Sequence, residues 1–116
     1  MSDLNKVMLI GRLGAKPELR TLSTGDAMTR LSVATSWHTK KDGVREERTE
    51  WHHVTVFGKS AESCARYLDK GKLVFVEGHL HNAHWKAKDG TDRYDREVRA
   101  DTVSFLSSPG EAAKAA

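Results

Sequence analysis

The chain has 116 residues, which is enough for one domain whose hydrophobic core needs no disulfide or metal. Its 19 lysines and arginines against 16 aspartates and glutamates give a formal net charge of +3, which suits an anionic ligand only where the cations are clustered. A single cysteine excludes an intrachain disulfide, and no apolar run approaches the roughly 20 residues that span a bilayer. We therefore expect a soluble, cytoplasmic protein with neither a signal peptide nor a membrane segment.

Five stretches of the sequence alternate as β-strands do, with successive side chains on opposite faces. They cover residues 5–13, 27–37, 50–57, 73–85 and about 93–106. Asp42-Gly43 and Asp89-Gly90 each lie between two of these stretches and predict turns. In the last stretch the apolar residues change parity, which predicts a β-bulge near Asp101.

The first stretch is apolar on both faces. Val7 and Leu9 share one face, and Met8 and Ile10 share the other. We expect this strand to be buried on both sides or strongly curved, with Gly11 allowing a bend.

One helix is expected from about Ser60 to Asp69. Apolar residues recur there at i, i+3, i+4 and i+7, namely at Ala61, Cys64, Ala65 and Leu68. Ser60 would cap the start of this helix and Gly71 would close its end.

Five strands with one helix between the third and the fourth have the element order of the five-stranded Greek-key barrel, the OB-fold. We therefore predict an all-β OB-fold domain over residues 1–107. Residues 108–116, which turn to Pro-Gly and then to alanine-rich sequence, are expected to form a flexible C-terminal segment.

The segment from Trp51 to Phe57 carries the most informative pattern. Its valines fall on one face, whereas Trp51, His53 and Phe57 fall on the other, and Lys59 follows the strand. A half-buried strand normally shows small polar groups to water, and this one shows aromatic rings and an imidazole. Aromatic faces interleaved with positive charge suit a single-stranded nucleic acid, because every base has a π-face and every linkage has a phosphate.

Candidate contacts to nucleic acid extend beyond this strand. The candidate base-stacking residues are Trp37, Trp51, Phe57 and Trp85. Packing in the core is the alternative for each of them, because buried aromatic residues are common. The candidate phosphate contacts include lysines of two hairpins beside Trp37 and Trp85, which are Lys40, Lys41 and Lys86. Simple solvation is the alternative for these lysines.

Other chemistries find less support in the sequence. His79 and His81 share a strand face and could chelate zinc or copper, but no cysteines or carboxylate cluster complete a site, so we expect no metal. There is no glycine-rich phosphate loop, nucleophile elbow or metalloprotease helix motif, and Cys64 lies on the apolar stripe of the expected helix. We expect neither an enzyme nor a cofactor.

Several short blocks follow one another in a fixed order along the chain. They are Asn5-Lys6-Val7, Gly11-Arg12-Leu13-Gly14, Pro17-Glu18-Leu19-Arg20, Thr49-Glu50-Trp51-His52, Val56-Phe57-Gly58-Lys59, Tyr67-Leu68-Asp69-Lys70-Gly71, Val76-Glu77-Gly78 and Asp92-Arg93-Tyr94. With these blocks the chain resembles the bacterial single-stranded DNA-binding proteins of the homotetrameric OB-fold type, over nearly all of residues 4–106.

This resemblance implies roles for individual residues. The four candidate aromatics match base-stacking positions of the family, and three lysines match basic positions near the DNA, namely Lys6, Lys59 and Lys70. His52 matches a histidine near the subunit interface. The implied function is non-sequence-specific coating and protection of single-stranded DNA in replication, recombination and repair, by a homotetramer in the cytoplasm that associates with the nucleoid.

The chain departs from the family pattern in three places. Relatives usually continue into a long tail with an acidic, hydrophobic tip that recruits replication and repair proteins, whereas this sequence stops at Ala116, so we expect the DNA-binding domain without that tail. Thr21 stands where relatives often have an aromatic residue. His53, His81 and His84 stand where Arg or Lys is frequent. If these histidines face phosphates, binding should strengthen as the pH falls through about 6.5.

A second function class fits the same fold. OB-fold assembly modules of the primosomal type bind mainly partner proteins and would not need all three tryptophans. Discrimination between DNA and RNA also stays open, because stacking and phosphate contacts suit both.

Overall fold

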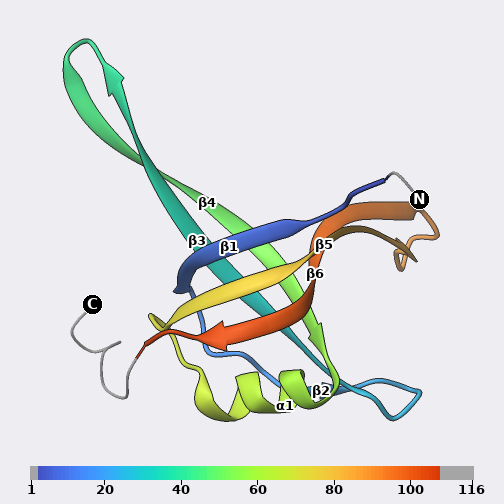
Figure 1. Cartoon of the computed structure of the whole chain (residues 1–116). Coiled ribbons are helices and arrows are strands. Elements are labelled where there is room, and N and C mark those ends of the chain that lie inside the picture. The colour runs from blue at the N-terminus through green and yellow to red at the C-terminus, as the bar shows by residue number, and fades with distance from the viewer. Residues whose placement is uncertain (1–2, 108–116) are drawn as a thin grey trace.

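A computed structural model describes residues 3–107 of the chain. Its elements follow the order β1 (Val7–Leu13), β2 (Arg20–Thr21), β3 (Ala27–Lys41), β4 (Val44–Phe57), α1 (Gly58–Tyr67), β5 (Leu73–Lys86) and β6 (Asp92–Phe105). The strands hydrogen-bond in the order β1-β5-β6-β4-β3-β2, and the end of β1 also pairs with β3, which closes the barrel (Figure 1). The predicted OB-fold barrel with one helix before β5 is therefore confirmed, and the two-residue strand β2 is an addition that the sequence did not indicate.

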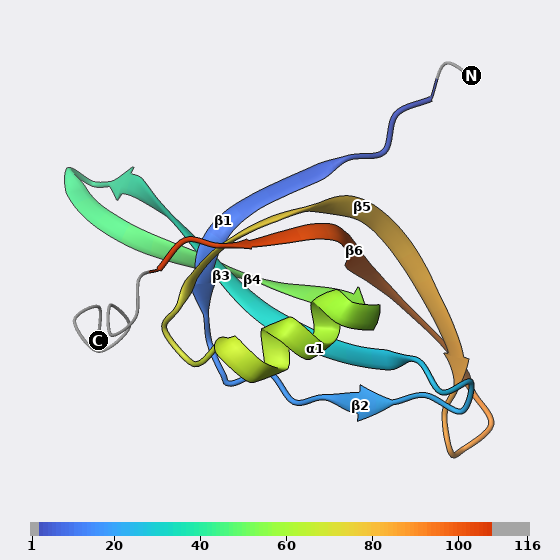
Figure 2. The same cartoon turned by 60° about the horizontal axis from the view of Figure 1, so that its bottom comes forward.

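The core of the barrel is built from the aliphatic faces of the strands. Its buried residues are Leu13, Leu31, Val33, Val54, Val56, Val74, Val76 and Val98, together with Ala61, Cys64 and Leu68 at or just after α1. Figure 2 shows α1 lying across one end of the barrel. Each fully buried valine or leucine contributes about 1.5–3 kcal/mol, so the barrel supplies most of the stability and the helix closes its end.

Closure of the barrel depends on a glycine where β1 crosses β3. Arg12 and Leu13 pair with Ala34 and Val33, and a Cβ on Gly11 would collide with the carbonyl oxygen of Ala34. A side chain at this position would hold the two strands apart, so Gly11 serves a close approach between backbones.

The predicted bulge is confirmed in β6. Glu77 of β5 pairs with Thr102, whereas the next residue, Gly78, pairs with Ala100. Asp101 is therefore the extra residue of the bulge, at the position where the apolar residues of β6 change parity.

The β3–β4 hairpin is much longer than the sequence predicts. Residues 38–41 and 44–49 also pair, through a two-residue turn in which Asp42 and Gly43 have φ values of 53° and 78°. Val44 is the one large apolar residue of this outer part, so the alternation that identifies a strand is lost there, although the tight turn keeps the pairing in register. The result is an arm that projects beyond the barrel (Figure 1).

The helix begins earlier than predicted and is capped differently. It starts at Gly58, whose φ of 71° turns the chain directly out of β4, and its N-cap is Phe57, without a side-chain hydrogen bond. The prediction that Ser60 caps the helix is wrong, because Ser60 lies inside the first turn. The helix also ends at Tyr67, and Leu68 is its C-cap, so Gly71 does not close it.

For β1 the sequence left two alternatives, burial on both sides or strong curvature, and burial on both sides is wrong for the isolated chain. Val7 and Leu9 pack against the core, but Met8 and Ile10 are 63% and 59% exposed. The sequence cannot distinguish burial inside one chain from a surface left open for another molecule.

Two further expectations concern the ends and the membrane. The predicted flexible segment at 108–116 lies outside the described residues. Over residues 3–107, no helix is both long enough and apolar enough to cross a membrane.

Candidate nucleic-acid interface

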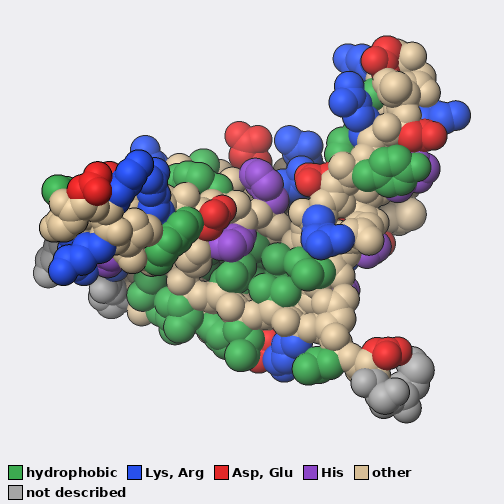
Figure 3. Space-filling model, turned by 90° about the horizontal axis from the view of Figure 1, so that it is seen from above, with side chains coloured by type: hydrophobic (Ala, Val, Ile, Leu, Met, Phe, Trp, Pro, Cys, Tyr) green, Lys and Arg blue, Asp and Glu red, His purple; other side chains and the backbone are tan. Residues whose placement is uncertain are grey.

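One outer face of the barrel collects side chains from four strands. Residues directly opposite one another in a sheet share a face, and the register of β3, β4, β5 and β6 therefore fixes which side chains lie together. We call this surface the aromatic face, and it contains Trp51, His53 and Phe57 from β4, His79, His81 and Trp85 from β5, Glu97 and Arg99 from β6, and Arg30 from β3. Figure 3 shows histidine side chains beside hydrophobic and basic ones on the upper side of the molecule.

The four candidate stacking residues all lie at the surface. Trp37, Trp51, Phe57 and Trp85 are 44%, 54%, 38% and 48% exposed. A core role for them is therefore wrong, and each leaves part of its ring open to a ligand.

Trp51 rests on the backbone of Gly14. The ring lies so close to this glycine that a Cβ there would collide with it. Gly14 follows β1, and its N–H donates to the carbonyl of Ser32, so the barrel closure itself fixes the surface under the ring. A supported ring is a better stacking platform than a freely rotating one, because less side-chain entropy is lost on binding.

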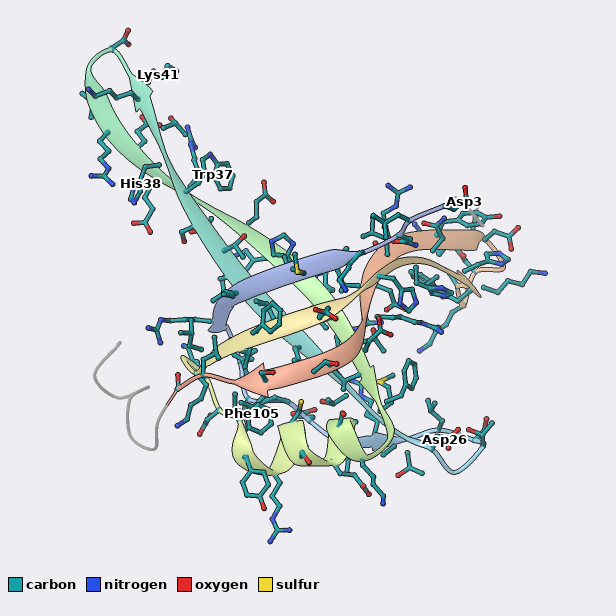
Figure 4. All side chains as sticks on the ribbon, in the orientation of Figure 1. Asp3, Asp26, Trp37, His38, Lys41 and Phe105 are labelled. Carbon is teal, nitrogen blue, oxygen red and sulfur yellow. The ribbon has the colours of Figure 1, made fainter. Side chains whose placement is uncertain are left out.

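Trp37 lies apart from the other three aromatics. It pairs with Arg48 on the arm, and strand alternation puts it on the opposite face of the β3–β4 hairpin from Trp51. Figure 4 shows Trp37 and His38 on opposite sides of the arm, with Lys41 near its tip. The structure therefore gives two aromatic areas, one on the barrel and one on the arm.

Four of the six candidate lysines lie on the arm or close in the chain to an aromatic residue of the aromatic face. Lys40 and Lys41 lie near the tip of the arm, Lys59 lies in the first turn of α1 beside Phe57, and Lys86 follows Trp85 at the end of β5. The remaining two are less suited to a phosphate. Lys6 makes an ion pair of 3.1 Å with Glu77, and Lys70 lies beyond the end of α1 that is remote from Phe57.

A buried carboxylate, not identified from the sequence, organises the centre of this surface. Glu97 is only 6% exposed, and its Oε2 accepts a hydrogen bond of 2.5 Å from the hydroxyl of Thr55. Nη2 of Arg30 lies 3.5 Å from the same oxygen, and Nε of Arg99 lies 3.5 Å from Oε1. The sequence indicates only that Glu97 and Arg99, which are two residues apart, share one face of β6.

The histidines have different surroundings. His53 and His81 lie on the aromatic face as predicted, and so does His79, whose Nδ1 is 3.5 Å from Asp101. His84 has the opposite parity to His81, stacks on Tyr94 with ring centroids 4.6 Å apart, and lies 3.4 Å from Asp92.

His52 lies on the other face of β4 from Trp51. It is half-buried, and its Nε2 is 2.8 Å from the hydroxyl of Thr35.

The described part of the chain contains neither a metal-binding cluster nor an activated cysteine nucleophile. Residues 3–107 contain no group of three His, Cys, Asp or Glu side chains placed to hold a metal ion. Cys64 is buried, and burial raises the pKa of its thiol to about 11. The reactive thiolate is therefore scarce at neutral pH, as expected for a packed cysteine.

A second exposed surface has a different character. Met8 and Ile10 of β1 lie opposite Glu77 and Phe75 of β5, on the outer side of the barrel. We call Met8, Ile10 and Phe75 the apolar face. Among the described strands, residues 7–11 of β1 pair only with β5. The other edge of this half of β1 is therefore open.

Comparisons with known proteins agree with this geometry. The family model described as the single-strand binding protein family matches residues 4–106. The chain superimposes on the Plasmodium falciparum SSB in complex with ssDNA with a TM-score of 0.80 and 29% identity, covering 92% of this chain and 98% of that one. It superimposes on a deletion mutant of the single-stranded DNA binding protein from Thermus aquaticus with a TM-score of 0.78 and 36% identity, covering 92% of this chain and 52% of that one. This chain thus spans about half the length of the Thermus chain.

Proposed function

Because this chain belongs to the single-strand binding protein family, we propose that it coats and protects single-stranded DNA, without sequence preference, in replication, recombination and repair. The observation that carries the proposal is the set of half-exposed aromatic rings beside histidines and arginines on one face of the barrel. Proteins of this family bind DNA and catalyse no reaction.

Stacking supplies most of the proposed binding free energy. A base stacked on an aromatic ring contributes about 1–3 kcal/mol, and every base offers such a face, so Trp51, Phe57 and Trp85 hold any sequence. His53, His81 and nearby lysines contact the phosphates. The strand would cross β4, β6 and β5 and extend to Trp37, Lys40 and Lys41 on the arm.

The second part of the proposal is that the chain assembles as a homotetramer. The apolar face exposes aliphatic side chains that a second copy would cover, and the open edge of β1 can pair with the β1 edge of that copy. Covering one isoleucine side chain contributes about 1.5–3 kcal/mol. We propose that His52, on the face of β4 away from Trp51, lies at a subunit interface. Sedimentation equilibrium should give four times the chain mass, and a monomer at all concentrations would contradict it.

The remaining parts of the proposal concern origin and location. We propose a bacterial protein, because its short sequence blocks resemble those of bacterial single-stranded DNA-binding proteins. We propose that it is cytoplasmic and nucleoid-associated, because its ligand arises there. Replication and repair proteins would act on the DNA that it coats, whether or not they contact the chain itself.

Fluorescence anisotropy of a labelled oligo-dT of about 30 nucleotides, a length that several OB domains can occupy, tests the function. We expect saturable binding that excess unlabelled single strands abolish and duplex DNA leaves unchanged. Oligo-U competitors show whether RNA is also bound. An absence of binding at low salt would contradict the proposal and favour a protein-binding assembly module.

A further inference from the structure

We infer that Arg99 is a nucleic-acid-binding residue whose guanidinium, held over the ring of Phe57 by the buried Glu97, forms the surface on which a base stacks. The inference rests on the proposed function and adds a residue to it. Arg99 did not belong to the aromatic and lysine pattern of the sequence, and only the folded barrel brings it to Phe57.

The position of the guanidinium is the first observation. Cζ of Arg99 lies 5.2 Å from the centroid of the Phe57 ring, within the roughly 6 Å range of a cation–π contact. One face of the ring is therefore covered by the arginine. A base that approaches from this side meets the guanidinium before the phenyl ring.

The second observation is the ion pair that fixes the position of the arginine. Oε2 of Glu97 accepts hydrogen bonds from Thr55 and Arg30, and Oε1 lies 3.5 Å from the buried Nε of Arg99, an ion-pair contact without a hydrogen bond. Because Glu97 is 6% exposed and Thr55 only 2%, this anchor lies beneath the surface. Glu97 is thus a positioning residue, and it reduces the entropy that Arg99 would lose on binding a ligand.

The charge balance separates this cluster from an ordinary structural ion pair. Two arginines share one carboxylate, which leaves an excess positive charge. The side chains of Arg30 and Arg99 are still 55% and 39% exposed, so that charge faces solvent. A planar, weakly hydrated guanidinium stacks on bases and also attracts phosphates. The chemistry of the cluster therefore matches a nucleotide and requires no particular base.

The test compares three variants by anisotropy with labelled oligo-dT. Arg99→Met keeps the length of the side chain and removes the planar cation, and we expect affinity to fall about three- to thirtyfold. Arg99→Lys restores the charge without the plane, and its affinity should lie between those of Arg99→Met and the unmodified protein. The matched control is Arg96→Met. Arg96 lies on the same strand with the opposite parity, where its Nε donates to Asn82, and we expect a change of less than about twofold.

Two further measurements make the result decisive. In a Phe57→Ala background, Arg99→Met should reduce the affinity for oligo-dT clearly less than it does alone. The stacking surface formed by the Phe57 ring and the Arg99 guanidinium is already lost in that background. Glu97→Gln keeps the size of the side chain but weakens the hold on Arg99, so it should reduce affinity in the presence of Arg99 and have little effect in Arg99→Met. Thermal unfolding of each variant shows whether a loss of affinity is caused by misfolding. If Arg99→Met misfolds, Arg99→Lys serves as the milder probe.

The outcomes distinguish the inference from the proposed function. If Arg99→Met behaves as Arg96→Met while Trp51→Ala weakens binding, the role of Arg99 is wrong and the function stands. An increase in affinity would show that Arg99 blocks the ring, which also overturns the inference. If oligo-dT does not bind even the unmodified protein, the proposed function itself fails.

Discussion

The aromatic face and the apolar face both expose hydrophobic side chains, but their neighbours differ. Trp51, Phe57 and Trp85 lie among histidines and arginines around a buried carboxylate, whereas Met8 and Ile10 lie beside Phe75 with an ion pair between Lys6 and Glu77 next to them. Both belong to the outer side of the same barrel.

This difference shows that exposed apolar area does not by itself identify a ligand. Flat rings beside cations suit a flexible polyanion with bases, and they leave room for solvent between the platforms. Aliphatic side chains on an open sheet edge offer no partner to a phosphate and suit a second protein surface. Four predictions test this division, from the largest expected effect to the smallest.

Removing two platforms should have the largest effect. In Trp51→Ala with Trp85→Ala, we expect binding to single-stranded DNA to weaken by about 2–6 kcal/mol, because each stacked base contributes about 1–3 kcal/mol. Both side chains are about half exposed, so the free energy of unfolding in urea should fall far less than the several kcal/mol typical of a truncated core aromatic. Tyr94→Ala is the control, since Tyr94 is exposed on the opposite face from Trp85. A large loss of stability in the double variant would show that the tryptophans are structural.

Charging the apolar face should disrupt assembly. Ile10→Lys removes about 1.5–3 kcal/mol of apolar burial from each copy and adds a cation that cannot be buried without cost. We expect sedimentation to show dissociation, with the spectroscopic signature of the fold preserved. Val44→Lys is the matched control, because Val44 is equally exposed but lies at the tip of the arm. Loss of assembly in Val44→Lys, with Ile10→Lys unaffected, would move the interface to the arm.

A methyl group under Trp51 should displace this platform. Gly14→Ala puts a Cβ where the ring lies, so the ring must move away. We expect affinity for oligo-dT to fall by about 1–2 kcal/mol, a cost typical of forced repacking, while the unfolding transition changes little because the ring is exposed. Unchanged affinity and unchanged tryptophan emission would show that Trp51 does not need this support.

The histidines should give the smallest effect. Protonated imidazoles are attracted to phosphates, so affinity should rise several-fold as the pH falls from about 8 to about 5.5 at fixed salt. His53→Gln with His81→Gln should flatten this dependence, whereas His84→Gln, on the opposite face of β5, should not. An affinity that does not vary with pH in the unmodified protein would remove the histidines from the phosphate contacts.

Local patterns in the sequence predicted much of this arrangement. Alternation predicted the strands, the bulge at Asp101 and the face that Trp51 shares with Phe57, because these features depend on neighbours in the chain. The outer arm was missed since Val44 is the one large apolar residue in 38–49, which leaves no alternation to detect. The start of α1 was missed since Gly58 turns the chain without a capping side chain.

Features that depend on distant segments could not be predicted. Glu97 meets Thr55 and Arg30 only because β6 lies parallel to β4, a pairing that no local pattern encodes. The apolar residues of β1 suggested burial, but a single chain leaves Met8 and Ile10 open. Both cases concern which surfaces meet, and periodicity reports only which residues share a surface.

The most direct measurement of the central claim is the intrinsic tryptophan fluorescence of the protein during titration with oligo-dT, at low and high salt, with duplex DNA as the control. Bases stacked on the half-exposed Trp37, Trp51 and Trp85 should quench the emission strongly and saturably, with single strands only and with modest weakening by salt. Binding without quenching would place the DNA elsewhere on the molecule, and emission unchanged by either nucleic acid, with no binding, would contradict the assignment of the aromatic face to single-stranded DNA.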